Sequence, residues 1–133
     1  MDASDVMAAW MMAYAFVPGK VETMTTIMDY KDVSLLELPI MKAREPCAHY
    51  QLIWRQRLGT GYVINVPVYM RIPMALVYTF MTPETSAKLS IVGGKADIRK
   101  TLGKVMSLDV LEKKYGGNLP DRKDDFWPPY LHL

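Results

Sequence analysis

The chain has 133 residues and a formal net charge of +2; 50% of its residues are hydrophobic and 23% are charged. A chain of this size can bury roughly two-thirds of its unfolded surface, so it is predicted to form one domain, or a large part of one, and not a disordered segment. The small net charge and the lack of a block of Lys and Arg argue against nucleic acid as a partner.

The first predicted element is a helix. Residues 2–16 are rich in Ala and Met, which favour helices, and Pro18-Gly19 ends the stretch. The apolar part is shorter than the ~18 residues that a membrane span needs. Asp2 and Asp5 precede it and carry the wrong charge for a signal or transit peptide.

A strand is predicted next, over residues 21–30, where β-branched residues dominate. Asp32 and Ser34 can cap a helix that begins near Leu35. Two prolines, Pro39 and Pro46, divide this helix into two pieces or kink it.

The middle of the chain is the most apolar. Residues 59–61, Gly-Thr-Gly, are predicted to break the chain before a short buried strand over residues 62–66. Residues 68–80 follow as a helix in which Arg71 is the only charge and which Pro73 can kink. A helix that is apolar on nearly every side is buried on both sides or contacts lipid.

The last third continues the alternation. Thr82-Pro83 is predicted to start a short helix. A strand over residues 88–92 and a basic amphipathic turn or helix over residues 95–102 follow. Ser107 is predicted to cap a helix over residues 108–115, which Gly116-Gly117 ends. The tail, 118–133, is predicted to be irregular and to pack by its aromatic residues. These are Phe126, Trp127 and Tyr130.

Strands and helices therefore alternate along the chain. The order strand, helix, strand, helix, strand implies crossover connections and a largely parallel sheet with helices packed on it. The predicted fold class is α/β.

Candidate catalytic and metal-binding groups are sparse. Cys47 and His49 lie two residues apart, but with one cysteine and only His132 besides they cannot supply a tetrahedral set of soft ligands. The single cysteine also excludes an internal disulfide, which indicates either a reducing compartment or a chain that needs no disulfide for stability. Asp29 and Asp32 are interpreted as turn and helix caps, and the sequence therefore predicts a protein that is not an enzyme.

Two features leave alternatives open. The basic residues of the predicted helix near residue 100 form either a solvated face or a contact with anionic lipid or an acidic partner. They are Lys95, Arg99, Lys100 and Lys104. The eleven methionines are either ordinary core filling or an adaptable surface that faces lipid or another subunit.

Four phrases, taken together and in this order, resemble a known family. They are residues 21–29 (VETMTTIMD), residues 57–67 (RLGTGYVINVP), residues 83–89 (PETSAKL) and residues 114–117 (KYGG). The resemblance runs from about residue 20 to residue 118. It is to the CRAL-TRIO lipid-binding domain, and within it to the fungal-type phosphatidylinositol/phosphatidylcholine transfer proteins.

The resemblance implies a sheet-floored apolar pocket for a phospholipid or another hydrophobic ligand, closed by a mobile lid. The lid would be residues 68–80, with apolar contacts from Val68, Tyr69, Ile72, Leu76 and Phe80. The family's Thr-x-x-Lys pair beneath the lipid headgroup corresponds to Thr85 and Lys88. Gln56 stands where the family has a Glu, so it can hydrogen-bond an inositol hydroxyl without the stronger charge-assisted bond. No metal and no cofactor other than a bound phospholipid is implied.

The family domain normally carries further N-terminal elements, and only about twenty residues precede the first matching strand here. The resulting division is a helix over 1–19, a partial CRAL-TRIO-like domain over 20–118 and a tail over 119–133. An uncovered pocket wall favours an accessory structural or lipid-contacting subunit, with other protein subunits or a membrane surface covering the open side. The alternative is a phosphatidylinositol/phosphatidylcholine transfer protein. The expected location is intracellular and peripheral to a membrane, with a mitochondrial assembly as one option.

Overall fold

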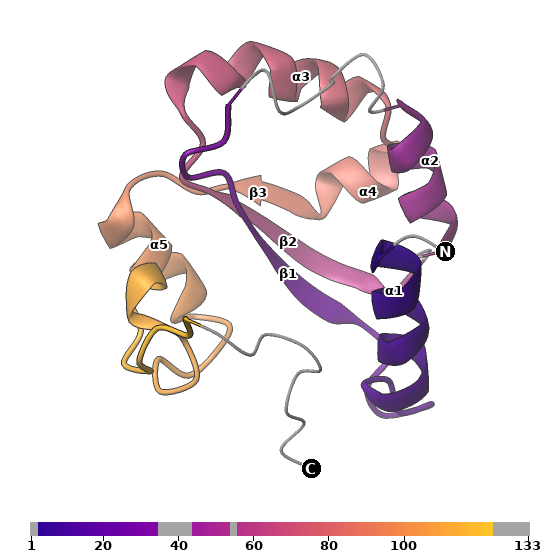
Figure 1. Ribbon diagram of the computed structural model, residues 1–133, viewed down its shortest axis with the longest axis horizontal. Helices are drawn as coiled ribbons and strands as arrows, with labels where there is room; N and C mark the ends of the chain where they lie inside the picture. The colour runs from indigo at the N-terminus through magenta and orange to yellow at the C-terminus, as the bar shows by residue number, and fades with distance from the viewer. Residues whose placement is uncertain (1–2, 35–43, 54–55, 124–133) are drawn as a thin grey trace. The chain divides into compact units, whose positions relative to one another are not determined.

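The computed structural model describes residues 3–34, 44–53 and 56–123 (Figure 1). The chain divides into two compact units, Met1–Ile91 and Val92–Leu133. Within the described residues no helix is both long enough and apolar enough to cross a bilayer. The sequence-based division at residues 19 and 118 stays a prediction.

A three-stranded parallel sheet forms the centre of the first unit. Its strands are β1 (Met24–Asp29), β2 (Leu58–Ile64) and β3 (Leu89–Ile91), in the spatial order β1-β2-β3. Each strand falls in or next to a stretch that the sequence predicted, and helices separate the strands along the chain. The α/β class and the parallel sheet are therefore confirmed.

The start of β2 differs from the prediction. Gly59 and Gly61 do not break the chain but lie inside the strand. A Cβ atom at Gly61 would lie 2.4 Å from Leu89 Cδ2 and 3.1 Å from Met28 Cε, so glycine lets side chains of both neighbouring strands cross β2 closely. The strand ends before Asn65, whose φ of 54° turns the chain out of the sheet.

In the described residues of this unit, five helical segments accompany the sheet. They are α1 (Ala3–Tyr14), α2 (Arg44–Ile53), the 3-10 helix η2 (Val68–Met70), α3 (Arg71–Thr79) and α4 (Pro83–Ala87). Pro46 lies in the first turn of α2, where a proline is tolerated. The helix piece predicted from Leu35 onward lies outside the described residues.

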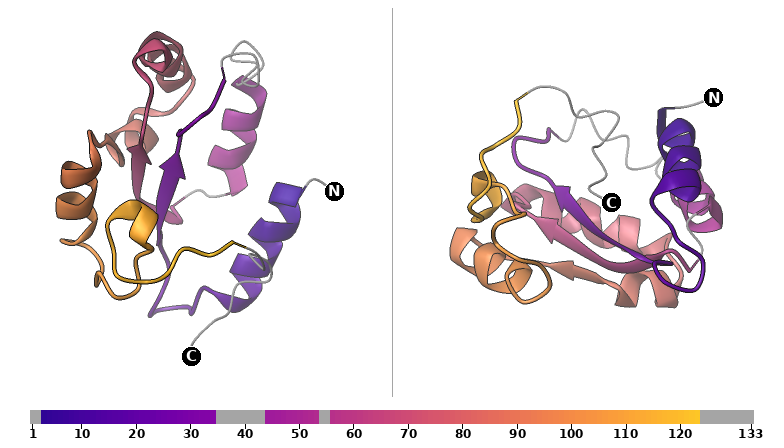
Figure 2. Two further views of the ribbon diagram at one scale, coloured as in Figure 1. Left: turned by 60° about the vertical axis from the view of Figure 1, so that its left-hand side comes forward. Right: turned by 90° about the horizontal axis from the view of Figure 1, so that it is seen from below.

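The apolar segment η2–α3 returns from the end of β2 toward α4, above the strands in Figure 1 and again in the left view of Figure 2. Pro73 does not kink it. Pro73 is the third residue of α3, a position whose N–H lacks an intrahelical acceptor in any helix. The change from 3-10 to α-helix falls earlier, at Met70 and Arg71.

The second unit contains α5 (Lys95–Leu102), with the predicted bounds. The predicted helix over residues 108–115 is wrong, because only its last turn is helical, as the 3-10 helix η3 (Lys113–Tyr115). The chain before it instead runs beside Leu119. The Lys113 N–H donates to the Leu119 carbonyl (2.8 Å), and the Leu119 N–H donates to the Leu111 carbonyl (3.0 Å).

The predicted glycine at the end of this segment is confirmed, since Gly116 follows η3 with φ at 88°. The Arg99 guanidinium of α5 donates a hydrogen bond to the Gly116 carbonyl and joins α5 to this turn. The three aromatic residues predicted to pack the tail lie outside the described residues.

Candidate functional site

The inner face of η2–α3 packs on the sheet. Met70 is 1% exposed and Met74 is 6% exposed, and both pack with Val63 of β2. Partly buried side chains surround these three. They are Met28, Tyr30, Val66 and Tyr78. Because methionine is flexible and polarizable, a floor built from methionine and tyrosine can accommodate an irregular apolar partner.

The outer face of the same segment is apolar as well. Val68 is 76% exposed and Ile72 is 84% exposed, and Tyr69 and Leu76 are also exposed. Of the five predicted lid contacts, four thus lie at the surface, and Phe80 is half-buried. The segment has apolar side chains on both faces, as its composition predicted, but only the inner face is covered.

Both ends of η2–α3 are held by side-chain hydrogen bonds that the sequence did not reveal. At one end the Tyr69 hydroxyl donates to the Val33 carbonyl (2.8 Å). At the other end Gln51 of α2 donates to the Phe80 carbonyl (3.3 Å) and accepts from the Thr82 N–H (2.7 Å). The partners of each bond lie about thirty or more residues apart in the chain, and no local pattern marks such a pair.

Below the segment, Tyr30, Cys47 and Tyr78 form a partly buried group. Burial raises the pKa of the Tyr30 hydroxyl, and the nearby Cys47 thiol raises it further. Burial also raises the pKa of the Cys47 thiol and that of the Tyr78 hydroxyl. All three groups are therefore neutral near pH 7, in keeping with an apolar interior.

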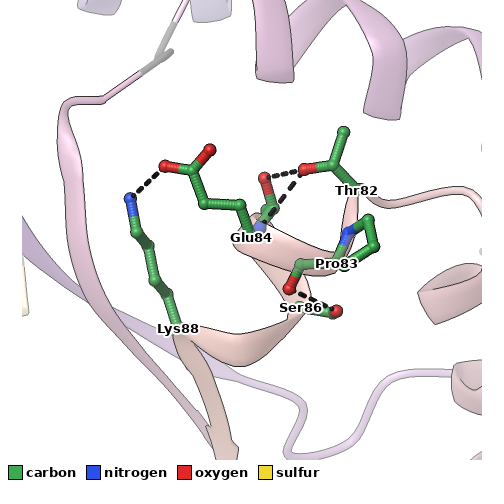
Figure 3. Close-up of polar contacts among 6 residues, drawn as sticks. Thr82, Pro83, Glu84, Ser86 and Lys88 are labelled. Atoms are coloured by element: carbon green, nitrogen blue, oxygen red, sulfur yellow. Dashed lines mark hydrogen bonds and ion pairs between the residues drawn. The ribbon is translucent and has the colours of Figure 1, made fainter.

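The predicted headgroup residue Lys88 ends α4 (Figure 3), and its N–H donates to the carbonyl of the other one, Thr85 (3.1 Å). Thr82 caps the helix as predicted: its hydroxyl oxygen accepts from the Thr85 N–H (3.2 Å) and lies 2.9 Å from the Thr85 hydroxyl. The Ser86 hydroxyl donates to the Pro83 carbonyl (3.1 Å). This cap fixes the short helix and with it the start of β3.

Lys88 has a carboxylate partner within the same helix. Its Nζ lies 3.2 Å from Glu84 Oε1 (Figure 3). The Glu84 side chain is 72% exposed, against 29% for the Lys88 side chain. The amine is thus half-sheltered at the beginning of β3, whereas the carboxylate reaches in from solvent. An exposed pair of this kind contributes only about 0–1 kcal/mol and can exchange for another anion.

Gln56, the third predicted headgroup residue, lies at the start of β2. It is exposed, and its φ of 63° marks the turn that precedes the strand. The Gly61 N–H donates to the Lys88 carbonyl (2.9 Å), which fixes Lys88 beside Gly61. Four residues lie between Gln56 and Gly61, and the extended part of this stretch, from Leu58 to Gly61, spans roughly 10 Å. The backbone therefore brings Thr85 and Lys88 together, whereas Gln56 lies in the turn before β2, away from Lys88.

Asp29 acts in the turn after β1. One of its carboxylate oxygens accepts from the Lys31 N–H (2.9 Å) and from the Asn65 amide (2.8 Å), so this side chain ties the ends of β1 and β2. In the part of the chain that the structure describes, no three His, Cys, Asp or Glu side chains gather as metal ligands would.

Comparison with known proteins gives a family and several relatives. The CRAL/TRIO domain family matches residues 4–117. A SEC14 cytosolic factor of Kluyveromyces lactis is 32% identical over 99 residues, which cover 73% of this chain and 32% of the relative. The phosphatidylinositol transfer protein SFH5 of Pyricularia oryzae is 30% identical over 97 residues, covering 68% and 24%. The chain thus spans about a third, or less, of the length of these curated relatives.

A solved structure supports the same fold. The crystal structure of Sfh5 superposes with a TM-score of 0.51 at 22% sequence identity, over 65% of this chain and 30% of that one. At this identity the likeness establishes the arrangement of strands and helices and leaves the ligand open.

Proposed function

Because the chain belongs to the CRAL/TRIO domain family, we propose that it binds one phospholipid in a pocket and carries it between membranes. The chain supplies the lid of this pocket, η2–α3, and the residues around the lipid headgroup, Thr85 and Lys88, which we call the headgroup corner. The proposal includes that the chain acts without catalysis and works at the periphery of a membrane. Relatives named as a phosphatidylinositol transfer protein and as SEC14 cytosolic factors support it.

The observation that carries the proposal is the apolar character of η2–α3 on both faces. A helix that only covered a core would need apolar residues on one side. Ile72 and Val68 instead expose apolar side chains to solvent, while Met70 and Met74 cover an adaptable floor. A lid that touches acyl chains on its inner side and the bilayer on its outer side needs both faces.

Lys88 is the proposed partner of the lipid phosphate. It is the half-sheltered cation at the start of β3, and Glu84 now occupies the position that an anion would take. Since Glu84 is largely exposed, it can swing into water when a phosphate binds Lys88, at the small cost of a surface ion pair. Gln56 can add a neutral hydrogen bond to a headgroup that extends toward the start of β2.

The test is lipid mass spectrometry on the purified chain after incubation with vesicles of phosphatidylcholine and phosphatidylinositol. We expect one phospholipid per chain and transfer of labelled lipid between vesicle populations. Lys88→Ala should reduce the preference for phosphatidylinositol, whereas the control Lys20→Ala, at an exposed turn, should not. A chain that retains no phospholipid, or equal behaviour of the two variants, would contradict the proposal.

The hypothesis favoured from the sequence, an accessory subunit of a larger assembly, finds no support in the comparisons. The two hypotheses differ in what the outer face of η2–α3 contacts, protein or membrane. Elution of the native protein in a much larger particle without chain-specific phospholipid would favour the subunit. Elution near the mass of the chain with bound phospholipid would favour the carrier.

A further inference from the structure

Charge is distributed unequally between the two units. Residues 1–91 contain eight Lys or Arg and eight Asp or Glu. Residues 92–123, the described part of the second unit, contain eight Lys or Arg and four Asp or Glu. Residues 92–123 thus carry a net charge of +4, which Asp124 and Asp125 reduce to +2 over the whole second unit, and the net charge of the chain lies in that unit.

The helix α5 carries much of this charge on its solvent side. Its inner side chains Ile98 and Leu102 are buried, at 2% and 0% exposure. Lys95, Lys100 and Lys104, in α5 and in the turn that follows it, are exposed. We call these three lysines the α5 basic surface. Lys100 lies in the last turn of α5, and Lys104 lies in the turn that directly follows the helix.

These lysines have no structural role that the described residues show. None of the three side chains forms a hydrogen bond or ion pair with another described residue, whereas the Arg99 guanidinium of the same helix donates to the Gly116 carbonyl. Lys95 occupies the first turn, where the helix dipole disfavours a cation. Asp97, in that same turn, suits the dipole instead and is the only acidic residue of α5.

Apolar side chains are exposed in the same unit. Val105 directly follows Lys104 and is 51% exposed, and Val110 is 66% exposed. A combination of unpaired lysines and exposed valines suits the interface of a bilayer, where ammonium groups meet phosphates and short apolar side chains enter the acyl boundary. Lysine is also a flexible point charge, which fits a diffuse anionic surface better than a fixed carboxylate geometry.

From these observations we propose that the α5 basic surface, together with Val105, docks the protein on a membrane rich in anionic phospholipid. This contact uses residues of the second unit, whereas the lid and Lys88 belong to the first unit. It would hold the chain at a negatively charged leaflet whether or not the first unit contains a phospholipid.

The test measures binding of the full chain to sedimented vesicles, of phosphatidylcholine alone and of phosphatidylcholine mixed with phosphatidylserine. We expect tighter binding to the mixed vesicles, and weaker binding as NaCl is raised. The double variant Lys100→Gln/Lys104→Gln should bind about thirtyfold more weakly, since each lysine near an anionic surface contributes about fivefold.

The matched control is Lys20→Gln/Lys31→Gln, which removes the same charge from exposed positions of the first unit. It should bind like the unchanged protein. Equal losses of vesicle binding in the two double variants would show that only the net charge of the chain matters, and would overturn the proposal. Unchanged binding of Lys100→Gln/Lys104→Gln would overturn it as well. Preferential capture by soluble poly-glutamate over mixed vesicles would assign the surface to an acidic protein instead.

The outcome is independent of the proposed function. Phospholipid retained by the chain is measured on the same variants by mass spectrometry. We expect Lys100→Gln/Lys104→Gln to retain as much phospholipid as the unchanged protein. Loss of retained phospholipid together with loss of docking would place the lysines in the pocket, against this inference.

Discussion

The helices α3 and α5 bury their inner faces in the same way and differ in what they show to solvent. Met74 lies on the inner face of α3, next to Met70 of η2. Ile98 and Leu102 form the inner face of α5, and all four side chains are nearly inaccessible to solvent. Outside, α3 exposes Ile72, whereas α5 exposes lysines. The inner faces stabilise the fold. The outer faces are therefore the candidates for the two proposed contacts with lipid, the lid contact of α3 and the docking contact of α5.

Replacing the inner residues should give the largest effects and should separate the two helices. Leu102→Ala is expected to lower the free energy of unfolding by about 3 kcal/mol, because a fully buried leucine leaves a cavity. Met74→Ala should cost less, about 2 kcal/mol, since the partly buried side chains around it can move into the space. Urea unfolding monitored by circular dichroism measures both.

The matched outward substitutions Lys100→Ala and Ile72→Ala should each change that free energy by less than about 0.5 kcal/mol. A larger loss at Met74 than at Leu102 would show that the floor beneath α3 is packed as rigidly as an ordinary core, contrary to its proposed adaptability.

The outer face of α3 should matter for lipid and not for stability. Ile72→Ala is expected to reduce uptake of phospholipid from vesicles about tenfold, because the removed methylene groups would no longer enter the bilayer. Lipid mass spectrometry after a fixed incubation measures uptake. Val21→Ala, at an exposed valine between α1 and β1, is the control and should leave uptake unchanged. If both variants take up lipid normally, the outer face of α3 does not contact the membrane.

The attachment of α3 to α2 should contribute less. Gln51→Leu removes the bonds to the Phe80 carbonyl and the Thr82 N–H, and we expect a loss of about 1 kcal/mol in unfolding free energy. Hydrogen exchange at the Thr82 amide should accelerate. Gln51→Glu keeps an acceptor for the Thr82 N–H but loses the donor to the Phe80 carbonyl. Its unfolding free energy should therefore lie between those of the unchanged protein and Gln51→Leu. Unchanged exchange in Gln51→Leu would mean that this contact does not restrain the segment.

Local signals in the sequence predicted much of this arrangement. The β-branched run before Asp29 indicated β1, Thr82 before Pro83 indicated the start of α4, and Gly116 indicated a left-handed residue after a helix. Each of these features depends on residues within a few positions of one another, and each is confirmed.

Long-range contacts explain what the sequence did not predict. Gly61 lies in a strand because Leu89, from another strand, fills the space above it. The stretch before η3 is not helical because its backbone bonds to Leu119. The Gln51 contact with Phe80 and the position of Gln56 relative to Lys88 depend on how separate elements pack. In the candidate site, therefore, the residue types could be predicted, and their mutual distances could not.

The smallest expected effect concerns the headgroup corner, whose residues belong to α4 and its C-cap and not to α3 or α5. Glu84→Gln should raise the affinity for phosphatidylinositol about twofold, because it removes a competitor worth about 0.3–0.5 kcal/mol from Lys88. Titration with labelled phosphatidylinositol measures this, with Glu45→Gln, at an exposed glutamate of α2, as the control. A weaker affinity in Glu84→Gln would show that Glu84 positions Lys88 for the lipid and does not compete with it. The corner would then be preformed for an anion, and the ion pair would be part of the binding site.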